Sequence, residues 1–151
     1  MDPALERWRP WGRIYLWRYP KSHRASLKGW HFAADAEGCD CLDEALNLLQ
    51  AARYPGRLKI AVEQRDLPEP FRGNTEPKRP AASLTLSYSR DWPGDTWSID
   101  ADEDGHARLS AGDEALEALR AAVSDMRTGE GDYVIWGRDD AALWLWWPPR
   151  R

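Results

Sequence analysis

Alternating carboxylates are the first residues in this chain that could do chemistry. Asp100, Asp102 and Asp104 precede Gly105, as in the opening of a calcium loop, where carboxylates at this spacing converge on one ion. The acid that should close such a loop is missing, because Ala111 stands in its place. We therefore predict a solvated acidic turn at the end of a strand and no tight calcium site.

Cysteine and histidine offer weaker candidates. Cys39 and Cys41 are the only cysteines, and their spacing is too short for the usual half of a zinc site. We predict no metal, no cofactor and no disulfide framework. His31 and Asp35 share a predicted strand face and form the best acid–base pair, while an exposed sheet position is the alternative for His31.

Catalytic motifs are missing from the sequence. The chain contains neither the Gly-x-Ser-x-Gly of a nucleophilic serine nor a phosphate-binding loop nor a dinucleotide fingerprint. We therefore predict no catalytic residues, although a carboxylate with a raised pKa could still act as a base.

Charge and hydropathy exclude several classes of protein. The net charge is −4 and the pI is about 5.4, which argues against a nucleic-acid binder, because phosphate contacts require a basic surface. No apolar run is long enough for a membrane span, and the first residues lack the pattern of a signal peptide. We therefore expect a cytoplasmic protein that binds neither nucleic acid nor membrane.

Tryptophan is the most unusual component of the chain. Ten tryptophans in 151 residues exceed what one small core needs, and this residue is enriched at interfaces as well as in cores. Alternate strand residues share a face, so Tyr15 lies beside Trp17, and Trp144 lies beside Trp146. If helices cover only one face of the sheet, these residues are either covered by another segment, such as the N-terminal arm, or form an exposed binding or dimer surface.

Two stretches of the chain resemble each other. Residues 30–42 align with 97–109, and residues 43–52 align with 113–122, with 12 identities in 23 columns. This match exceeds the few identities expected by chance and predicts an internal duplication.

The duplication divides one domain, 1–151, into two β-β-α-β halves. The predicted sub-repeats span 13–65 and 82–147, joined by a proline-rich linker at 66–80, and the second has an extra C-terminal strand. Helices are predicted near 40–53 and 113–126, each with one apolar stripe.

This pattern predicts an α+β fold with a mainly antiparallel sheet and two helices packed on one face. One continuous sheet and two packed sheets are both compatible with the sequence.

The leading functional expectation is a non-catalytic binding protein. Aromatic anchors supply affinity and acidic groups speed the encounter with a basic protein, so Tyr15, Trp17, Trp144 and Trp146, with Asp100, Asp102 and Asp104 at the rim, are the predicted binding residues. Small bacterial immunity and antitoxin proteins act in this way, which makes such a type one expectation by analogy. The partner could equally be a second copy of the chain. The alternatives are a small-molecule binder with a Trp-lined pocket between the repeats, and a small enzyme with a carboxylate or His31 as base.

Overall fold

The computed structural model describes residues 3–22, 24, 27–52, 55–128, 133–135 and 142–146, with the backbone alone at 133–135. These residues form three helices and nine strands, an α+β architecture as the sequence predicts. The helices are α1 (Pro3–Arg7), α2 (Ala36–Ala51) and α3 (Asp113–Thr128). The strands are β1 (Ile14–Arg18), β2 (Trp30–Ala34), β3 (Gly56–Ile60), β4 (Arg79–Pro80), β5 (Ser83–Tyr88), β6 (Trp97–Ala101), β7 (His106–Ala111), β8 (Tyr133–Ile135) and β9 (Leu143–Leu145). The sequence predicts the last two strands at 133–136 and 142–147, and their final residues, Trp136 and Trp147, lie outside the described residues.

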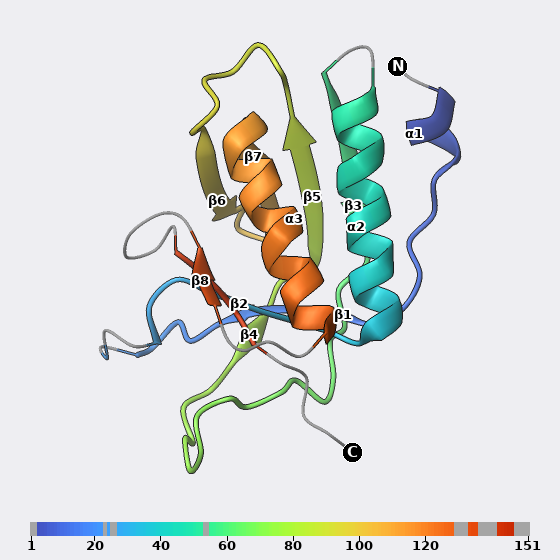
Figure 1. Ribbon diagram of the computed structural model, residues 1–151. Coiled ribbons are helices and arrows are strands. Elements are labelled where there is room, and N and C mark those ends of the chain that lie inside the picture. Colours follow the sequence, from blue (N-terminus) through green and yellow to red (C-terminus); the bar gives the residue numbers. More distant parts are fainter. Residues whose placement is uncertain are drawn as a thin grey trace.

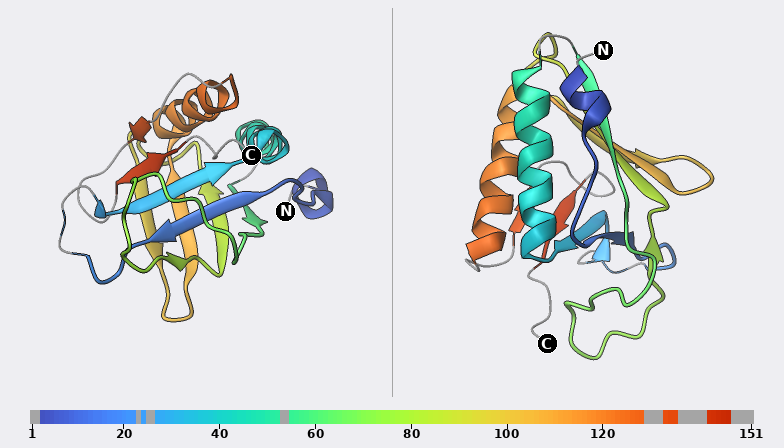
Figure 2. Two further views of the ribbon diagram at one scale, coloured as in Figure 1. Left: turned by 90° about the horizontal axis from the view of Figure 1, so that it is seen from below. Right: turned by 90° about the vertical axis from the view of Figure 1, so that its right-hand side faces the viewer.

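The strands form two sheets whose strands run across each other (Figure 2, left). Sheet A has the order β4-β1-β2-β9-β8, and sheet B has the order β3-β5-β7-β6. Pairing is antiparallel except for β2–β9 and β5–β7, which are parallel. The helices α2 and α3 lie side by side over one face of sheet B (Figure 1). The predicted mainly antiparallel arrangement with two helices on one face is confirmed, and the extra C-terminal strand belongs to sheet A.

Each sheet contains strands from both halves of the chain. Sheet A joins the pair β1–β2 to the pair β8–β9, and sheet B joins β3–β5 to β6–β7. Apart from the two-residue strand β4, the chain therefore contains two successive units with the same order of elements, β1-β2-α2-β3-β5 and β6-β7-α3-β8-β9. Each unit gives its first strand pair to one sheet and its second pair to the other, so that both units share one core.

This strand order favours a register for the repeat that differs from the sequence match. Both α2 and α3 contain 16 residues, and each follows its preceding strand at the same distance, so Ala36 corresponds to Asp113. The sequence match instead pairs Asp43 with Asp113, and places Trp30 of the interior strand β2 against Trp97 of the edge strand β6. The two registers differ by about two helical turns, so the apolar stripes coincide in both.

Strand β7 is an element that the sequence pattern does not reveal. Its inward side chains are Ala107, Leu109 and Ala111, while His106 and Arg108 are exposed. Alanine has a low strand propensity, so the alternation is weak and the segment resembles a loop before the helix. The predicted β-β-α-β halves therefore omit this strand.

The start of α2 lies before the predicted start near residue 40. Asp35 is the N-cap residue, because its Oδ1 accepts hydrogen bonds from the backbone N–H of Gly38 at 2.7 Å and of Arg13 at 3.0 Å. Gly38 lowers the helix propensity of the first turn, which explains why the pattern misplaces the cap. Cys39, which the sequence places in a loop, is inside the helix.

Gly38 allows the chain before β1 to approach α2 closely. A Cβ atom at this position would lie 2.3 Å from the carbonyl oxygen of Arg13, so the two backbones would have to separate. We expect Gly38→Ala to lower the free energy of unfolding by about 1–3 kcal/mol, as overpacking does elsewhere. Urea denaturation measures this loss, and Asn47→Ala at an exposed position of α2 is the matched control. An unchanged midpoint for Gly38→Ala would contradict the close approach.

Candidate functional site

The predicted aromatic residues lie on the face of sheet A that points away from the main core. Segment 61–78, which includes most of the predicted linker, covers this face in place of the N-terminal arm (Figure 2). Tyr15 is 8% exposed and Trp17 is 0% exposed, while Trp144 and Trp146 are half-buried. A partner therefore cannot reach Tyr15 or Trp17 in this conformation, and only the last strand offers part of the predicted aromatic surface.

His31 stands at the centre of this covered face, and the rings around it have centroids 5.0–6.4 Å from its own. Tyr15 lies on the same face of β1 as Trp17 and packs in the same cluster. We call this set the His31 cluster: Tyr15, Trp17, Tyr19, His31, Phe71, Trp144 and Trp146. The indole Nε1 of Trp146 donates to Nδ1 of His31 at 2.9 Å. Since an indole N–H can only donate, Nδ1 is an acceptor and Nε2 carries the hydrogen. Nε2 then donates to the carbonyl oxygen of Leu27 at 3.2 Å, so the neutral ring is fully hydrogen-bonded.

Burial lowers the pKa of His31 from its ordinary value of 6.5 to about 4. The hydrogen bond to the Leu27 carbonyl and the negative charge of Glu69 oppose this effect without cancelling it. His31 is 0% exposed, and Asp35, its predicted acid–base partner, caps α2 instead. The geometry therefore gives His31 a packing role and offers no base to a substrate.

Glu69 ties segment 61–78 to the His31 cluster. The hydroxyl of Tyr19 and the side-chain amide of Asn74 both donate to the Glu69 carboxylate, and Nζ of Lys78 lies 3.8 Å from it. Lys78 also donates to two backbone carbonyls of the same segment, at 3.1 and 3.3 Å. Burial and the bond to Glu69 raise the pKa of Tyr19 above its usual value, so the hydroxyl remains a donor. These interactions therefore hold segment 61–78 in place over the outer face of sheet A.

The acidic turn between β6 and β7 is stabilised by one of its own carboxylates. Oδ1 of Asp102 accepts hydrogen bonds from the backbone N–H of Asp104 and of His106, both at 3.0 Å. Gly105 has a φ of 87°, a conformation that favours glycine. The side chains of Asp100, Asp102 and Asp104 are exposed. Throughout the described part of the chain, no three His, Cys, Asp or Glu side chains gather as a metal site requires.

Two further groups with reactive side chains occupy structural positions. Cys39 and Cys41 are buried in α2, where burial raises the pKa of Cys39 to about 11 and also raises that of Cys41, so both are protonated thiols at neutral pH. Oγ of Ser83 lies 2.7 Å from Nδ1 of His106 on the neighbouring strand, a pair that the sequence did not suggest. Ser83 is only 5% exposed, so its hydroxyl is not presented to a substrate.

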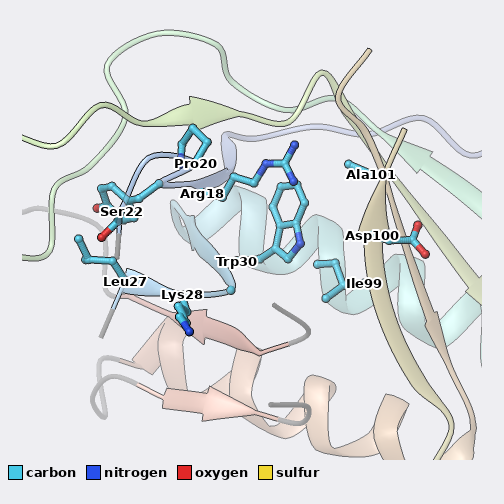
Figure 3. A pocket seen from close by; sticks show the side chains of 11 residues that line it. Arg18, Pro20, Ser22, Leu27, Lys28, Trp30, Ile99, Asp100 and Ala101 are labelled. Carbon is cyan, nitrogen blue, oxygen red and sulfur yellow. The ribbon is translucent and has the colours of Figure 1, made fainter. Parts of the chain in front are cut away.

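A pocket of about 500 Å³ opens between the two sheets. The residues that line this inter-sheet pocket are Arg18, Tyr19, Pro20, Ser22, Leu27, Lys28, Gly29, Trp30, Ile99, Asp100 and Ala101. Figure 3 shows the guanidinium of Arg18 over the ring of Trp30, with Ile99 and Asp100 of β6 across the space. The guanidinium carbon lies 5.0 Å from the ring centroid, which is within the range of a cation–π interaction.

Two cations in this pocket have no carboxylate partner in the part of the chain that the structure describes. Arg18 is half-buried and Lys28 is exposed. Among the described residues, neither side chain makes an ion pair or donates a hydrogen bond to the protein. The guanidinium of Arg18 therefore keeps its N–H donors for solvent or a ligand, and a negatively charged group is the best acceptor for them.

The His31 cluster holds one wall of the inter-sheet pocket in place. The carbonyl of Leu27 accepts from His31, and the carbonyl of Lys28 accepts from Nε1 of Trp144 at 3.1 Å. Both carbonyls belong to pocket-lining residues. The covered aromatic face thus positions the segment that carries one of the two pocket cations.

The sequence suggested a Trp-lined pocket between the repeats, but not the residues that form it. Arg18 follows Ile14 and Leu16 on the inward face of β1, and a charge at the end of an apolar face was the signal that could have identified it. Trp30 was notable in the sequence only as the first residue of the repeat, and no pattern in the sequence indicated a role for Lys28.

Comparisons with known proteins give no further information on this site: no family model, no curated protein and no solved structure matches the chain. Of the helices that the structure describes, none is long and apolar enough to cross a bilayer.

Proposed function

We propose that this protein is a non-catalytic binding protein whose ligand occupies the inter-sheet pocket. The observation that carries the proposal is the pair formed by Arg18 and Trp30, a stacked cation that has no acceptor among the described residues and lies at the wall of a pocket of about 500 Å³. The volume of the pocket is in the range of ligand sites, and its lining combines apolar side chains with several polar and charged ones. An aromatic wall beside two cations suits a ligand with an apolar body and a negative group.

The chemistry of the described side chains favours binding over catalysis. His31 is neutral and its two ring nitrogens are occupied, Ser83 is buried, and both cysteines are protonated. Of the described residues that line the inter-sheet pocket, Asp100 alone has a carboxylate, and its side chain is exposed. An acid–base pair would need a second group within hydrogen-bond reach.

Binding of the anionic aromatic dye 8-anilinonaphthalene-1-sulfonate tests this proposal. We expect dye fluorescence to rise on binding, and Arg18→Gln to weaken the affinity about tenfold, because a hydrogen bond to a charged group is lost. Arg72→Gln, an exposed position in segment 61–78, is the matched control and should bind as the parent does.

The same titration separates the pocket from simple surface binding. Trp11 and Trp92 are each 38% exposed and could attract an aromatic dye. Fluorescence that Trp92→Ala abolishes and Arg18→Gln leaves unchanged would contradict the proposed pocket.

A basic protein partner is the second candidate, and the exposed acidic turn favours it. The carboxylates of Asp100, Asp102 and Asp104 are exposed at the end of β6 and in the turn that follows it. Such a cluster speeds encounter with a positively charged surface. A protein of the immunity or antitoxin type would use the turn in this way, with half-buried Trp144 and Trp146 as the remaining aromatic contacts.

A further inference from the structure

β6 is an edge strand whose outer side borders the inter-sheet pocket. The ladder to β7 is flanked by hydrogen bonds at Thr96 and Asp102, so by antiparallel alternation Ser98 and Asp100 bond to β7 while Ile99 and Ala101 direct their backbone groups outward. Within the part of the chain that the structure describes, these outward N–H and C=O groups of Ile99 and Ala101 have no partner.

Two other edges of the sheets are shortened or covered, since β4, an edge strand of sheet A, has only two residues. β4 pairs with β1 at one edge of sheet A, and α1 lies beside β3 at the other edge of sheet B (Figure 2, right). An open strand edge readily pairs with another chain, and natural proteins usually cover or blunt it. At β6 the open edge instead adjoins a pocket with an aromatic wall and two cations.

We propose that the ligand of the inter-sheet pocket is an extended peptide segment of a partner protein, which pairs with the open edge of β6 and directs a carboxylate side chain towards Arg18 and Lys28. This inference rests on the proposed function and names the class of ligand. Binding by strand addition uses backbone hydrogen bonds for affinity and neighbouring pockets for alternate side chains.

The geometry of an added strand agrees with the position of the two cations. Successive side chains of a strand point to opposite faces of the sheet, so every second side chain of the peptide enters the space that Figure 3 shows between β6 and Trp30. Arg18 and Lys28 line that space and lack carboxylate partners within the described residues. A peptide carboxylate there would give both cations an acceptor, with apolar contact from Ile99 and Trp30.

The charge preference is tested with two blocked pentapeptides, which read Thr-Val-Glu-Val-Thr and Thr-Val-Gln-Val-Thr and carry an N-terminal fluorescent label. Fluorescence anisotropy with the full-length protein should show binding of the glutamate peptide, with the glutamine peptide about tenfold weaker. Arg18→Gln should remove this difference, and Arg72→Gln should preserve it. Equal affinities of both peptides for the parent protein would overturn the proposed carboxylate contact.

The backbone contact is tested with two variants at one position. Ala101→Pro removes an outward N–H and leaves the hydrogen bonds of Asp100 and Asp102 to β7, because proline is tolerated where the N–H faces away from the sheet. Ala101→Val keeps the N–H and adds bulk. We expect Ala101→Pro to bind the glutamate peptide about tenfold more weakly than Ala101→Val, while both variants bind the dye equally.

The outcomes separate this inference from the proposed function. If the parent protein does not bind the dye, both the proposed function and the peptide inference are overturned. Dye binding that depends on Arg18, together with no binding of the glutamate peptide, would overturn the peptide ligand alone. A parent protein that sediments as a dimer, with Ala101→Pro monomeric and no peptide bound by either, would show that a second copy occupies the edge and would likewise overturn the inference.

Discussion

Replacing Leu119 with alanine is expected to lower the free energy of unfolding by about 2–5 kcal/mol, the range for truncating an enclosed leucine. Leu119 is 2% exposed and lies in α3 where the two sheets and both helices meet. Its neighbours around a small void include Leu16 and Phe32 of sheet A and Leu84 and Leu109 of sheet B. The enclosing residues come from several elements, so they cannot easily collapse into the space that the truncation leaves.

Urea denaturation of the Leu119→Ala protein measures this loss. Leu48→Ala is the matched control, because Leu48 is only partly buried at the edge of the same core and its truncation should cost clearly less. A Leu119→Ala protein with the midpoint of its parent would mean that α3 does not present this face to the sheets.

The free energy of unfolding should fall as the pH falls from about 6.5 to 4, with a loss of about 3 kcal/mol from His31 alone. The folded protein holds His31 neutral down to a pKa of about 4, whereas the unfolded chain takes up the proton below 6.5. The unfolded state therefore binds more protons in this window and gains stability from acid. Above the ordinary histidine pKa this contribution to folding is complete, and it is lost as the pH falls from about 6.5 to the folded pKa of about 4.

Protonation of His31 would disrupt a hydrogen bond in the folded protein. Nδ1 accepts the indole N–H of Trp146, so a hydrogen on Nδ1 would point at another donor. Among the described residues, the titratable side chains that face the ring are Glu69 of segment 61–78 and Tyr19, which follows β1, and only Glu69 favours the charged form.

Two histidine variants check the pH dependence. His31→Gln should flatten the change in stability between pH 6.5 and 4. His106→Gln should leave the change intact, because His106 is exposed. An unchanged pH profile for a stably folded His31→Gln protein would contradict the assignment to His31.

Local patterns in the sequence predicted most elements of the fold. The alternation in β5 and β6 and the apolar stripe of α3 are strong signals, because each of these elements has one face in the core. β1 was predicted from its β-branched and aromatic residues, since both of its faces are buried. β7 escaped prediction because alanine fills two of its three inward positions. The start of α2 was misplaced because Gly38 serves a close backbone approach that no pattern within a helix can reveal.

The site was harder to predict because it depends on how the sheets assemble. Tyr15 and Trp17 were predicted as binding residues, with coverage by another segment as the alternative, and the proline-rich segment covers them through Glu69 and Phe71. The inter-sheet pocket requires Arg18 of β1 to face β6, and the pairing order of the strands cannot be derived from one sequence. The sequence did predict that Asp100 lies at the rim of a binding site. Asp100 lines the inter-sheet pocket, which is the proposed ligand site.

The most direct measurement for the proposed pocket is a titration of the isotope-labelled protein with the dye, followed through its tryptophan indole N–H signals. The chain has ten tryptophans, and Trp30→Phe assigns the signal of Trp30. We predict that the Trp30 signal moves on dye addition in the parent protein, while the signals of exposed Trp11 and Trp92 stay in place. Movement of the Trp11 or Trp92 signals with that of Trp30 unchanged would contradict a ligand site between the sheets.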